Sequence, residues 1–148
     1  MGLNYRSGTI DDIEHVFRLS RLVLDEAWSK NVMLQSLQVG YDLYVCYQET
    51  MLAGYVLSQD VLLETQIMQV CVHQDVRGMG VGKTLMLMLM QDKQDADELM
   101  LEVRSSNALA QGFYAHLGFK QAGVRPNYYS KTKTKPREDA VVMVYSPA

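Results

Sequence analysis

The sequence has few or none of the features that mark several large classes of protein. Its two cysteines, Cys46 and Cys71, both lie in apolar runs, so we expect buried thiols rather than a disulfide framework. No His, Cys or carboxylate spacing is typical of a metal site, which predicts no bound metal. No apolar run reaches the roughly 18 residues of a membrane span, and the first residues lack the apolar core of a signal peptide. We therefore expect a soluble, cytoplasmic protein.

Charge of one sign is not in large excess either. The 148 residues include 14 Lys and Arg and 17 Asp and Glu, which gives a formal net charge of −3. This balance gives no reason to expect direct binding to nucleic acid. The length predicts one domain over residues 1–148. We also expect that the protein has no membrane partner and that it is a monomer or a weak dimer.

The sequence does contain a glycine-rich segment between a strand-like run and a helix-forming run. Three glycines alternate after an apolar stretch, and basic residues bracket them. Such a turn presents the unpaired N–H groups of a helix start, and the positive end of the helix dipole, to an anion. We predict that it binds a pyrophosphate, with an ordinary glycine-rich turn as the alternative that the segment alone leaves open. The residues are Val70, Cys71, Val72, Arg77, Gly78, Met79, Gly80, Val81, Gly82 and Lys83.

Hydrophobic periodicity and turn residues predict the element order β-α-α-β-β-β-α-β-α-β-β. Hairpins in the middle and at the end indicate antiparallel pairing, whereas the strand–helix–strand unit from Val70 to Val103 predicts a parallel pair. The expected fold is α/β, with a mixed, mostly antiparallel sheet of about seven strands around a central parallel pair, flanked by about four helices. The strands are expected near residues 3–6, 41–47, 51–59, 62–72, 99–103, 119–129 and 141–145.

Two helices carry specific expectations. The run Leu85–Met90 alternates Leu and Met and is apolar all round, which predicts a helix buried on most sides. A methionine-rich partner surface is the alternative. The last helix is expected to be capped by Ser105 or Ser106 and to end at Gly118.

Three phosphate-binding patterns compete for the glycine segment. A Walker A loop needs glycine where Arg77 stands, and the dinucleotide pattern needs a third glycine where the chain has Lys83 or Leu85. Arg77-x-x-Gly80-x-Gly82 remains. That pattern resembles the Q/R-x-x-G-x-G/A motif of the GNAT acetyltransferases.

Later motifs narrow this resemblance to one subgroup. Five stretches are similar to the RimI-type ribosomal-protein-alanine N-acetyltransferases of bacteria. The resemblance covers essentially the whole chain and is dense from Val70 onward, although Gly78 and Met79 stand where the family often has basic residues. The stretches are Ala27–Ser29, Leu101–Ala108, Phe113–Phe119, Arg125–Tyr129 and Arg137–Met143.

The resemblance implies a GNAT fold, acetyl-CoA as co-substrate, and acetyl transfer to the N-terminal alanine of a small-subunit ribosomal protein. A GNAT enzyme acting on a small amine or antibiotic is one alternative, and a non-catalytic acyl-CoA-binding module is another. Glu102 and Tyr114 together argue against the module. The Arg125–Tyr129 segment argues against a small amine, because the resemblance implies that Arg125, Asn127, Tyr128 and Tyr129 contact the peptide.

Glu102 is the predicted general base. Strand alternation places it on the face opposite Leu101 and Val103. An α-amine has a pKa of about 8, so a carboxylate can collect its proton directly or through water. The alternative is a structural ion pair with Arg104, two residues along on the same face.

Tyr114 is the predicted general acid. It shares a helix face with Asn107 and lies beside an apolar stripe of Leu109, Phe113 and Leu117. Its phenol, with a pKa of about 10, can supply a proton to the departing thiolate. A buried structural tyrosine is the alternative.

The remaining site residues are expected to hold acetyl-CoA. The backbone of Val70–Val72 should meet the pantetheine arm, so Cys71 need not be a nucleophile. The resemblance implies that Asn107 also binds this arm, whereas helix capping is its other possible role. The basic stretch Lys131–Arg137 faces solvent, the CoA phosphates or an acidic surface.

Overall fold

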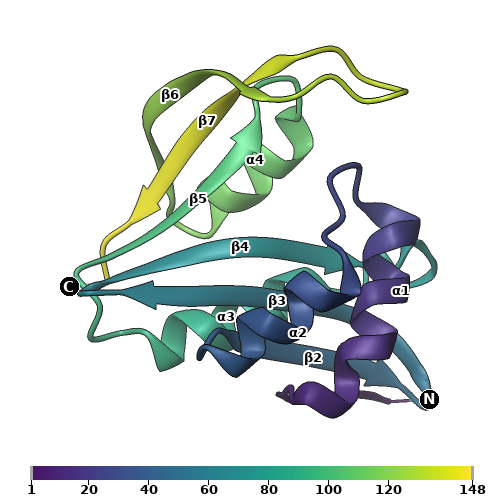
Figure 1. Cartoon of the computed structure of the whole chain (residues 1–148). Coiled ribbons are helices and arrows are strands. Elements are labelled where there is room, and N and C mark those ends of the chain that lie inside the picture. The colour runs from purple at the N-terminus through teal and green to yellow at the C-terminus, as the bar shows by residue number, and fades with distance from the viewer. Residues whose placement is uncertain (1, 148) are drawn as a thin grey trace.

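The computed structural model describes residues 2–147. One seven-stranded sheet has the order β1-β2-β3-β4-β5-β7-β6, and only β4 and β5 are parallel. This confirms the predicted mixed sheet with its parallel pair (Figure 1). The strands are β1 Leu3–Ser7, β2 Asp42–Gln48, β3 Met51–Val61, β4 Glu64–Val72, β5 Glu98–Arg104, β6 Lys120–Tyr129 and β7 Glu138–Tyr145. The α-helices are α1 Ile13–Val23, α2 Lys30–Gln38, α3 Val81–Asp92 and α4 Ala108–His116.

The helices cover both faces of the sheet. In Figure 1, α1 and α2 lie in front of β2–β4, and α3 lies behind. Leu19 of α1 and Met33 of α2 are buried with Tyr55 on the front face, whereas Leu85 and Leu89 of α3 are buried on the other. Two apolar layers therefore hold the sheet between the helices.

The expectation that α3 is buried on most sides holds for five of the six residues of the Leu85–Met90 run. Leu85, Met86 and Leu89 are buried, and Met88 and Met90 are partly buried against the same core. Leu87 is 47% exposed, so one side of the helix faces solvent.

The parallel pair separates soon after it begins. β4 and β5 pair only over Glu64–Gln66 and Glu98–Met100, and they diverge beyond that point (Figure 1). The pairing of β3 with β4 shifts register between Leu57 and Ser58, and bulges of this kind re-aim strands beside active sites. The second half of β4 is consequently paired with β3 along one edge and has no strand partner along the other among the described residues.

Helix caps are set by side chains close in sequence. Thr9 accepts a hydrogen bond from the Asp11 N–H and forms a capping box with Asp12, and Ser29 caps α2. The last helix differs from expectation, because Asn107 caps it, not Ser105 or Ser106. No helix in residues 2–147 is long and apolar enough to cross a membrane.

Asp12 is a buried carboxylate held by four hydrogen bonds. Arg6 donates two of them at 2.9 and 2.8 Å, the Thr9 N–H donates one at 2.8 Å and the Tyr47 hydroxyl one at 2.7 Å. The Arg6 guanidinium is the main reason that the pKa of Asp12 falls to about 2. The carboxylate thus joins β1, β2 and the start of α1.

Asp12→Asn should lower the free energy of unfolding at pH 7 by about 2 kcal/mol, since each pKa unit is worth about 1.4 kcal/mol. The folded pKa lies below the unfolded one, so this stability is present above about pH 4 and is lost as the pH falls toward 2. Urea unfolding at pH 7 and pH 3 checks it, with Asp11→Asn as the exposed control. An equal deficit at both pH values would contradict the linkage.

Candidate active site

The glycine segment forms a turn that ends in the start of α3. Gly78 and Gly80 have φ of +83° and +79°, a region that residues with a Cβ rarely adopt. Gly80 is the N-cap of α3 and provides no side-chain cap, so the first N–H groups of the helix stay available. Arg77, Met79 and Lys83 are exposed around them. This geometry is compatible with an anion site, and the binding of a pyrophosphate here stays a prediction.

Gly80→Ala should raise the KM for acetyl-CoA about tenfold, with little effect on kcat. A Cβ at this φ costs roughly 1–2 kcal/mol, and the turn would shift to relieve it. Steady-state kinetics at varied acetyl-CoA measures the change. Gly112→Ala in α4 is the matched control, since a Cβ there meets nothing. An unchanged KM in Gly80→Ala would show that the turn does not hold the co-substrate.

The end of β4 leads into this turn. Val70 and Val72 are half-buried and face away from Cys71, which is buried. Burial raises the pKa of the Cys71 thiol to about 12. A thiol that stays protonated is a poor nucleophile, so an acyl-enzyme on Cys71 is not supported.

Glu102 lies on the open side of β5, between the buried Leu101 and Val103, as predicted. Its carboxylate is 3.0 Å from the Arg125 Nε. The alternative of an ion pair with Arg104 is wrong, because Arg104 pairs with Glu26 and Glu138 instead. The carboxylate is therefore matched by a cation from β6, two strands away.

Aromatic side chains of β6 surround this ion pair. Tyr128 and Tyr129 are in edge contact at 5.1 Å, and the Arg125 guanidinium lies 5.6 Å from the Tyr128 ring. Burial first, and then the charge of Glu102, raises the pKa of Tyr129 to about 12. Asn127 has φ of +53°, and its N–H donates to Asp139 at 2.8 Å. Three of the four residues predicted to contact the peptide, Arg125, Tyr128 and Tyr129, thus lie beside Glu102.

The buried polar atoms at this place are mostly paired. The Oε2 atom of Glu102 pairs with Arg125, and the Nη2 atom of Arg104 pairs with Glu26. Among the buried side-chain atoms of the described chain, the Arg104 Nε and the Ser58 hydroxyl have neither a hydrogen bond nor an ion pair.

Tyr114 projects from α4 onto the rim of the core. Its ring contacts Phe113 at 5.2 Å and Phe119 at 6.0 Å. Burial raises its pKa, and the nearby Tyr129 adds to this. The phenol therefore stays protonated at neutral pH, as a proton donor must. The predicted apolar stripe beside it is partly wrong, because Leu109 is 90% exposed.

Asn107 has the capping role that sequence reasoning left open. Its Oδ1 accepts a hydrogen bond from the Ala110 N–H at 3.1 Å. The amide N–H₂ of the same side chain is not needed for the cap. Capping and a contact with the pantetheine arm are thus compatible.

Comparison with known proteins decides the family. The model of the acetyltransferase (GNAT) domain matches residues 11–131. The chain belongs to the GNAT acetyltransferase family. This confirms the resemblance carried by the Arg77–Gly82 motif, and it makes the chain an acetyltransferase.

Named relatives of this GNAT acetyltransferase act on one ribosomal protein. The [ribosomal protein bS18]-alanine N-acetyltransferase of Escherichia coli strain K12 is 34% identical over 118 residues, or 78% of each chain. The enzyme of that name from Haemophilus ducreyi is 30% identical over 135 residues, covering 89% of this chain and 92% of that one. The crystal structure of the Escherichia coli ribosomal-protein-S18-alanine N-acetyltransferase superposes with a TM-score of 0.91 at 28% identity, over 99% and 95% of the chains.

Sequence reasoning about this GNAT acetyltransferase missed the role of Arg104, which was considered only as a partner for Glu102. Arg104 instead binds Glu26 from the loop between α1 and α2 and lies 4.6 Å from the Tyr129 ring. Periodicity could show that Arg104 shares a face with Glu102. It could not show which distant acids reach it.

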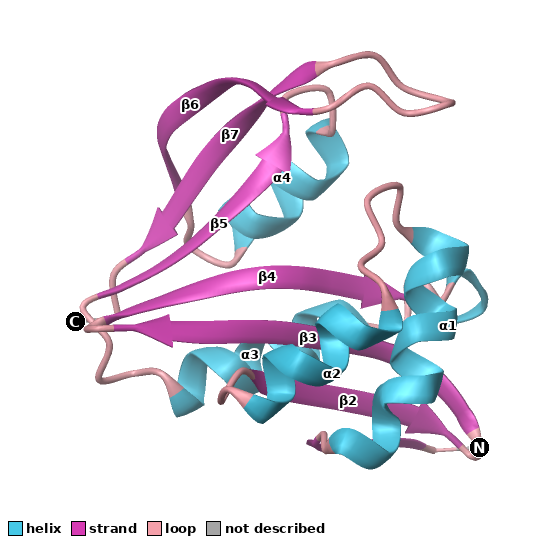
Figure 2. Ribbon diagram, viewed as in Figure 1, coloured by secondary structure: helices cyan, strands magenta, loops and turns pink. Residues whose placement is uncertain are grey.

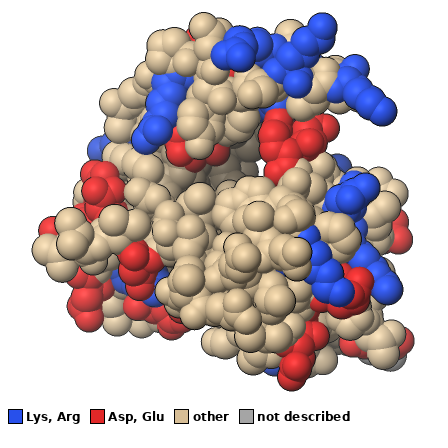
Figure 3. All heavy atoms as spheres, viewed as in Figure 1, with Lys and Arg blue, Asp and Glu red and all other residues tan. Residues whose placement is uncertain are grey.

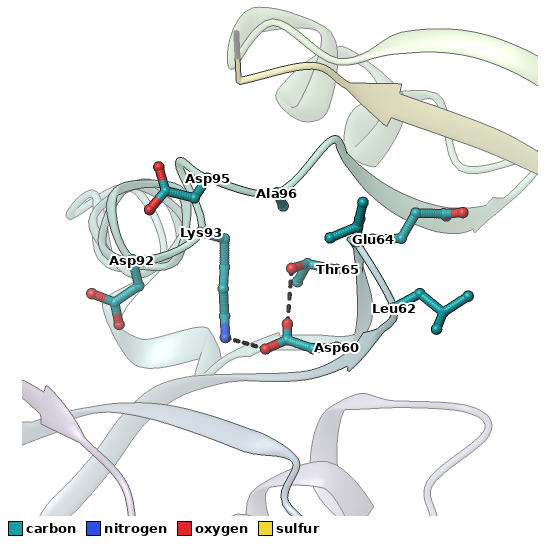
Figure 4. Close-up of a pocket in the computed structure, with 9 residues that line it drawn as sticks. Asp60, Leu62, Glu64, Thr65, Asp92, Lys93, Asp95 and Ala96 are labelled. Carbon is teal, nitrogen blue, oxygen red and sulfur yellow. Dashed lines mark hydrogen bonds and ion pairs between the residues drawn. The ribbon is translucent and has the colours of Figure 1, made fainter.

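A separate pocket of about 260 Å³ lies at the other end of β4 (Figure 4). There Lys93 binds Asp60 at 2.8 Å and Asp42 at 2.7 Å, and Thr65 donates to Asp60. The acids neutralise Lys93, which ties the segment after α3 to β2 and β3. The Lys93 side chain is 15% exposed, whereas most of the segment around it is exposed. No group of His, Cys, Asp and Glu among residues 2–147 is arranged to hold a metal ion.

Proposed function

We propose that this GNAT acetyltransferase transfers the acetyl group of acetyl-CoA to the N-terminal α-amine of a protein, and that its substrate is the N-terminal alanine of ribosomal protein bS18. One observation carries the proposal. Glu102 lies on the face of β5 opposite the buried Leu101 and Val103, and its carboxylate pairs with Arg125 of β6 beside the rings of Tyr128 and Tyr129. The names of the relatives supply the substrate.

Acetyl-CoA would bind along the separated edge of β4. The N–H groups at the start of α3, with Arg77 and Lys83, suit the pyrophosphate. The free edge of Val70–Val72 suits the amides of the pantetheine arm, in the manner of an added strand. Asn107 would add a donor from the start of α4. The thioester then lies between β4 and β5, within reach of both catalytic side chains.

The chemistry follows from proton transfers at the nitrogen and at the sulfur. Glu102 takes a proton from the α-ammonium group and passes it to solvent, so that the neutral nitrogen attacks the thioester carbonyl carbon. The new C–N bond forms, the nitrogen loses its second proton to solvent, and the C–S bond breaks with its electron pair leaving on the sulfur. Tyr114 donates its proton to this thiolate and recovers one from solvent. The products are the acetylated N-terminus and CoA.

Mass spectrometry tests the substrate. A peptide with the bS18 N-terminal sequence is incubated with the enzyme and acetyl-CoA, beside the same peptide blocked at its α-amine and beside a polyamine. We expect a gain of one acetyl group on the free peptide alone. Acetylation of the polyamine without any on the peptide would contradict the proposal and favour a small-amine enzyme.

A further inference from the structure

The loop of residues 24–29, between α1 and α2, is tied across the cleft by two ion pairs. Glu26 pairs with Arg104 at the end of β5, and Asp25 pairs with Lys135 at 2.9 Å. Figure 2 shows this loop rising toward the loop that joins β6 and β7. Figure 3 shows a hollow between the two parts of the molecule, with acidic side chains at its edge below basic ones. The peptide site is thus bridged by contacts of the chain with itself.

The two ion pairs differ in their surroundings. The Arg104 side chain is 6% exposed, whereas Lys135 and Asp25 are 40% and 34% exposed. An exposed pair contributes little because water and salt screen it. Solvent and salt screen a pair with a buried member much less. The Glu26–Arg104 contact is therefore the one that should fix the loop.

Arg104 is itself held firmly on the β5 side. It donates to Glu138 at 2.8 Å, and Glu138 also accepts from Ser105 and from the Ser106 N–H. Arg104 is the main reason that the pKa of Glu138 falls to about 2. Its guanidinium lies against the Tyr129 ring at 4.6 Å. The Arg104 side chain of β5 thus contacts Glu138 of β7, the Tyr129 ring of β6 and, through Glu26, the loop of residues 24–29.

Arg104 is also close to the proposed chemistry. It lies two residues beyond Glu102 on the same face of β5, a separation of roughly 7 Å. We propose that Arg104 is a positioning residue that acts through Glu26 to hold the loop of residues 24–29 as one wall of the peptide site. This inference rests on the proposed function. It requires that the loop affects binding of the peptide and leaves that of acetyl-CoA unchanged.

The matched variants Glu26→Gln and Asp25→Asn test this, because each removes one charge from the same loop. For Glu26→Gln we expect the peptide KM to rise about tenfold, the size of losing one charge-assisted contact. We expect kcat within twofold of wild type, with the acetyl-CoA KM and the Tm unchanged. Asp25→Asn should match wild type in all four measurements.

Trp28 provides a second readout in the same loop. It is the only tryptophan in the chain, and its ring lies 6.4 Å from that of Tyr41. Acrylamide quenching of its fluorescence should increase in Glu26→Gln and stay unchanged in Asp25→Asn. This measurement needs no substrate.

Four outcomes separate the possibilities. Equal peptide KM values in the two variants would overturn the inference. So would a fall in Tm with a parallel rise in both KM values, because that would show a general structural role. If wild type acetylates no alanine-starting peptide, the proposed function fails. In that case, unchanged Trp28 quenching in Glu26→Gln would also show that the Glu26–Arg104 contact does not hold the loop of residues 24–29.

Discussion

Replacing Glu102 with Gln should lower kcat at pH 7 by about 100-fold or more, the usual contribution of a general base. Gln keeps the size of the side chain and can still accept from Arg125, which lies 3.0 Å from the carboxylate. The loss therefore comes from the missing base and leaves packing intact. Steady-state kinetics with the alanine-starting peptide measures it.

The pH dependence of this deficit is specific to the proposed role. An α-amine has a pKa of about 8, so at about pH 9 most of it is already neutral without help from the enzyme. The ratio of wild-type to Glu102→Gln activity should therefore fall between pH 7 and pH 9. Glu98→Gln is the control, since Glu98 lies on the same strand but at its paired end. A variant with full turnover at pH 7 would remove Glu102 from the mechanism.

Tyr114→Phe should lower kcat by about 100-fold and leave the affinity for acetyl-CoA unchanged. The substitution keeps the ring contacts with Phe113 and Phe119 and removes only the hydroxyl. Without this donor the thiolate must leave unprotonated or take a proton from water. Comparing kcat with the binding constant for acetyl-CoA, and with the Tm, separates catalysis from packing.

A second tyrosine supplies the control for Tyr114. Tyr145 packs on the same Phe119 at 5.5 Å but lies at the end of β7, opposite Leu99 at the start of β5. Tyr145→Phe should therefore keep the wild-type rate. Because burial raises the pKa of Tyr114, wild-type kcat should show no loss from its ionisation up to about pH 10. Equal rates in both variants would exclude Tyr114 as the acid.

Local signals in the sequence predicted the parts of the site that depend on local structure. The glycine turn depends mainly on neighbouring residues, so spacing was enough to predict a turn that leads into a helix, although the helix begins at Val81, before the predicted Leu85. The alternation of apolar and polar residues was enough to predict that Glu102 faces away from the core, because successive residues of a strand point to opposite faces. The element order followed from the same periodicities.

Contacts between distant elements could not be predicted in this way. The Glu102–Arg125 pair joins residues on β5 and β6, which are separated by β7 in the sheet. Its existence depends on the register of two antiparallel ladders. The partners of Arg104 depend further on where the loop of residues 24–29 lies. The exposure of Leu87 and Leu109 was not predicted for a related reason. An apolar side chain does not reveal which face of its helix packs against another element.

The three-residue ladder between β4 and β5 has a consequence for hydrogen exchange. Among the described residues it is the only strand pairing between β1–β4 and β5–β7. Most of β4 therefore lacks a strand partner along this edge, and a co-substrate lying along it would supply hydrogen-bond partners and protect the strand. Backbone amides of residues 67–72 should then exchange with deuterium more slowly when acetyl-CoA is bound. Acetyl-CoA bound in this way would provide the second half of β4 with the neighbour that β5 does not provide.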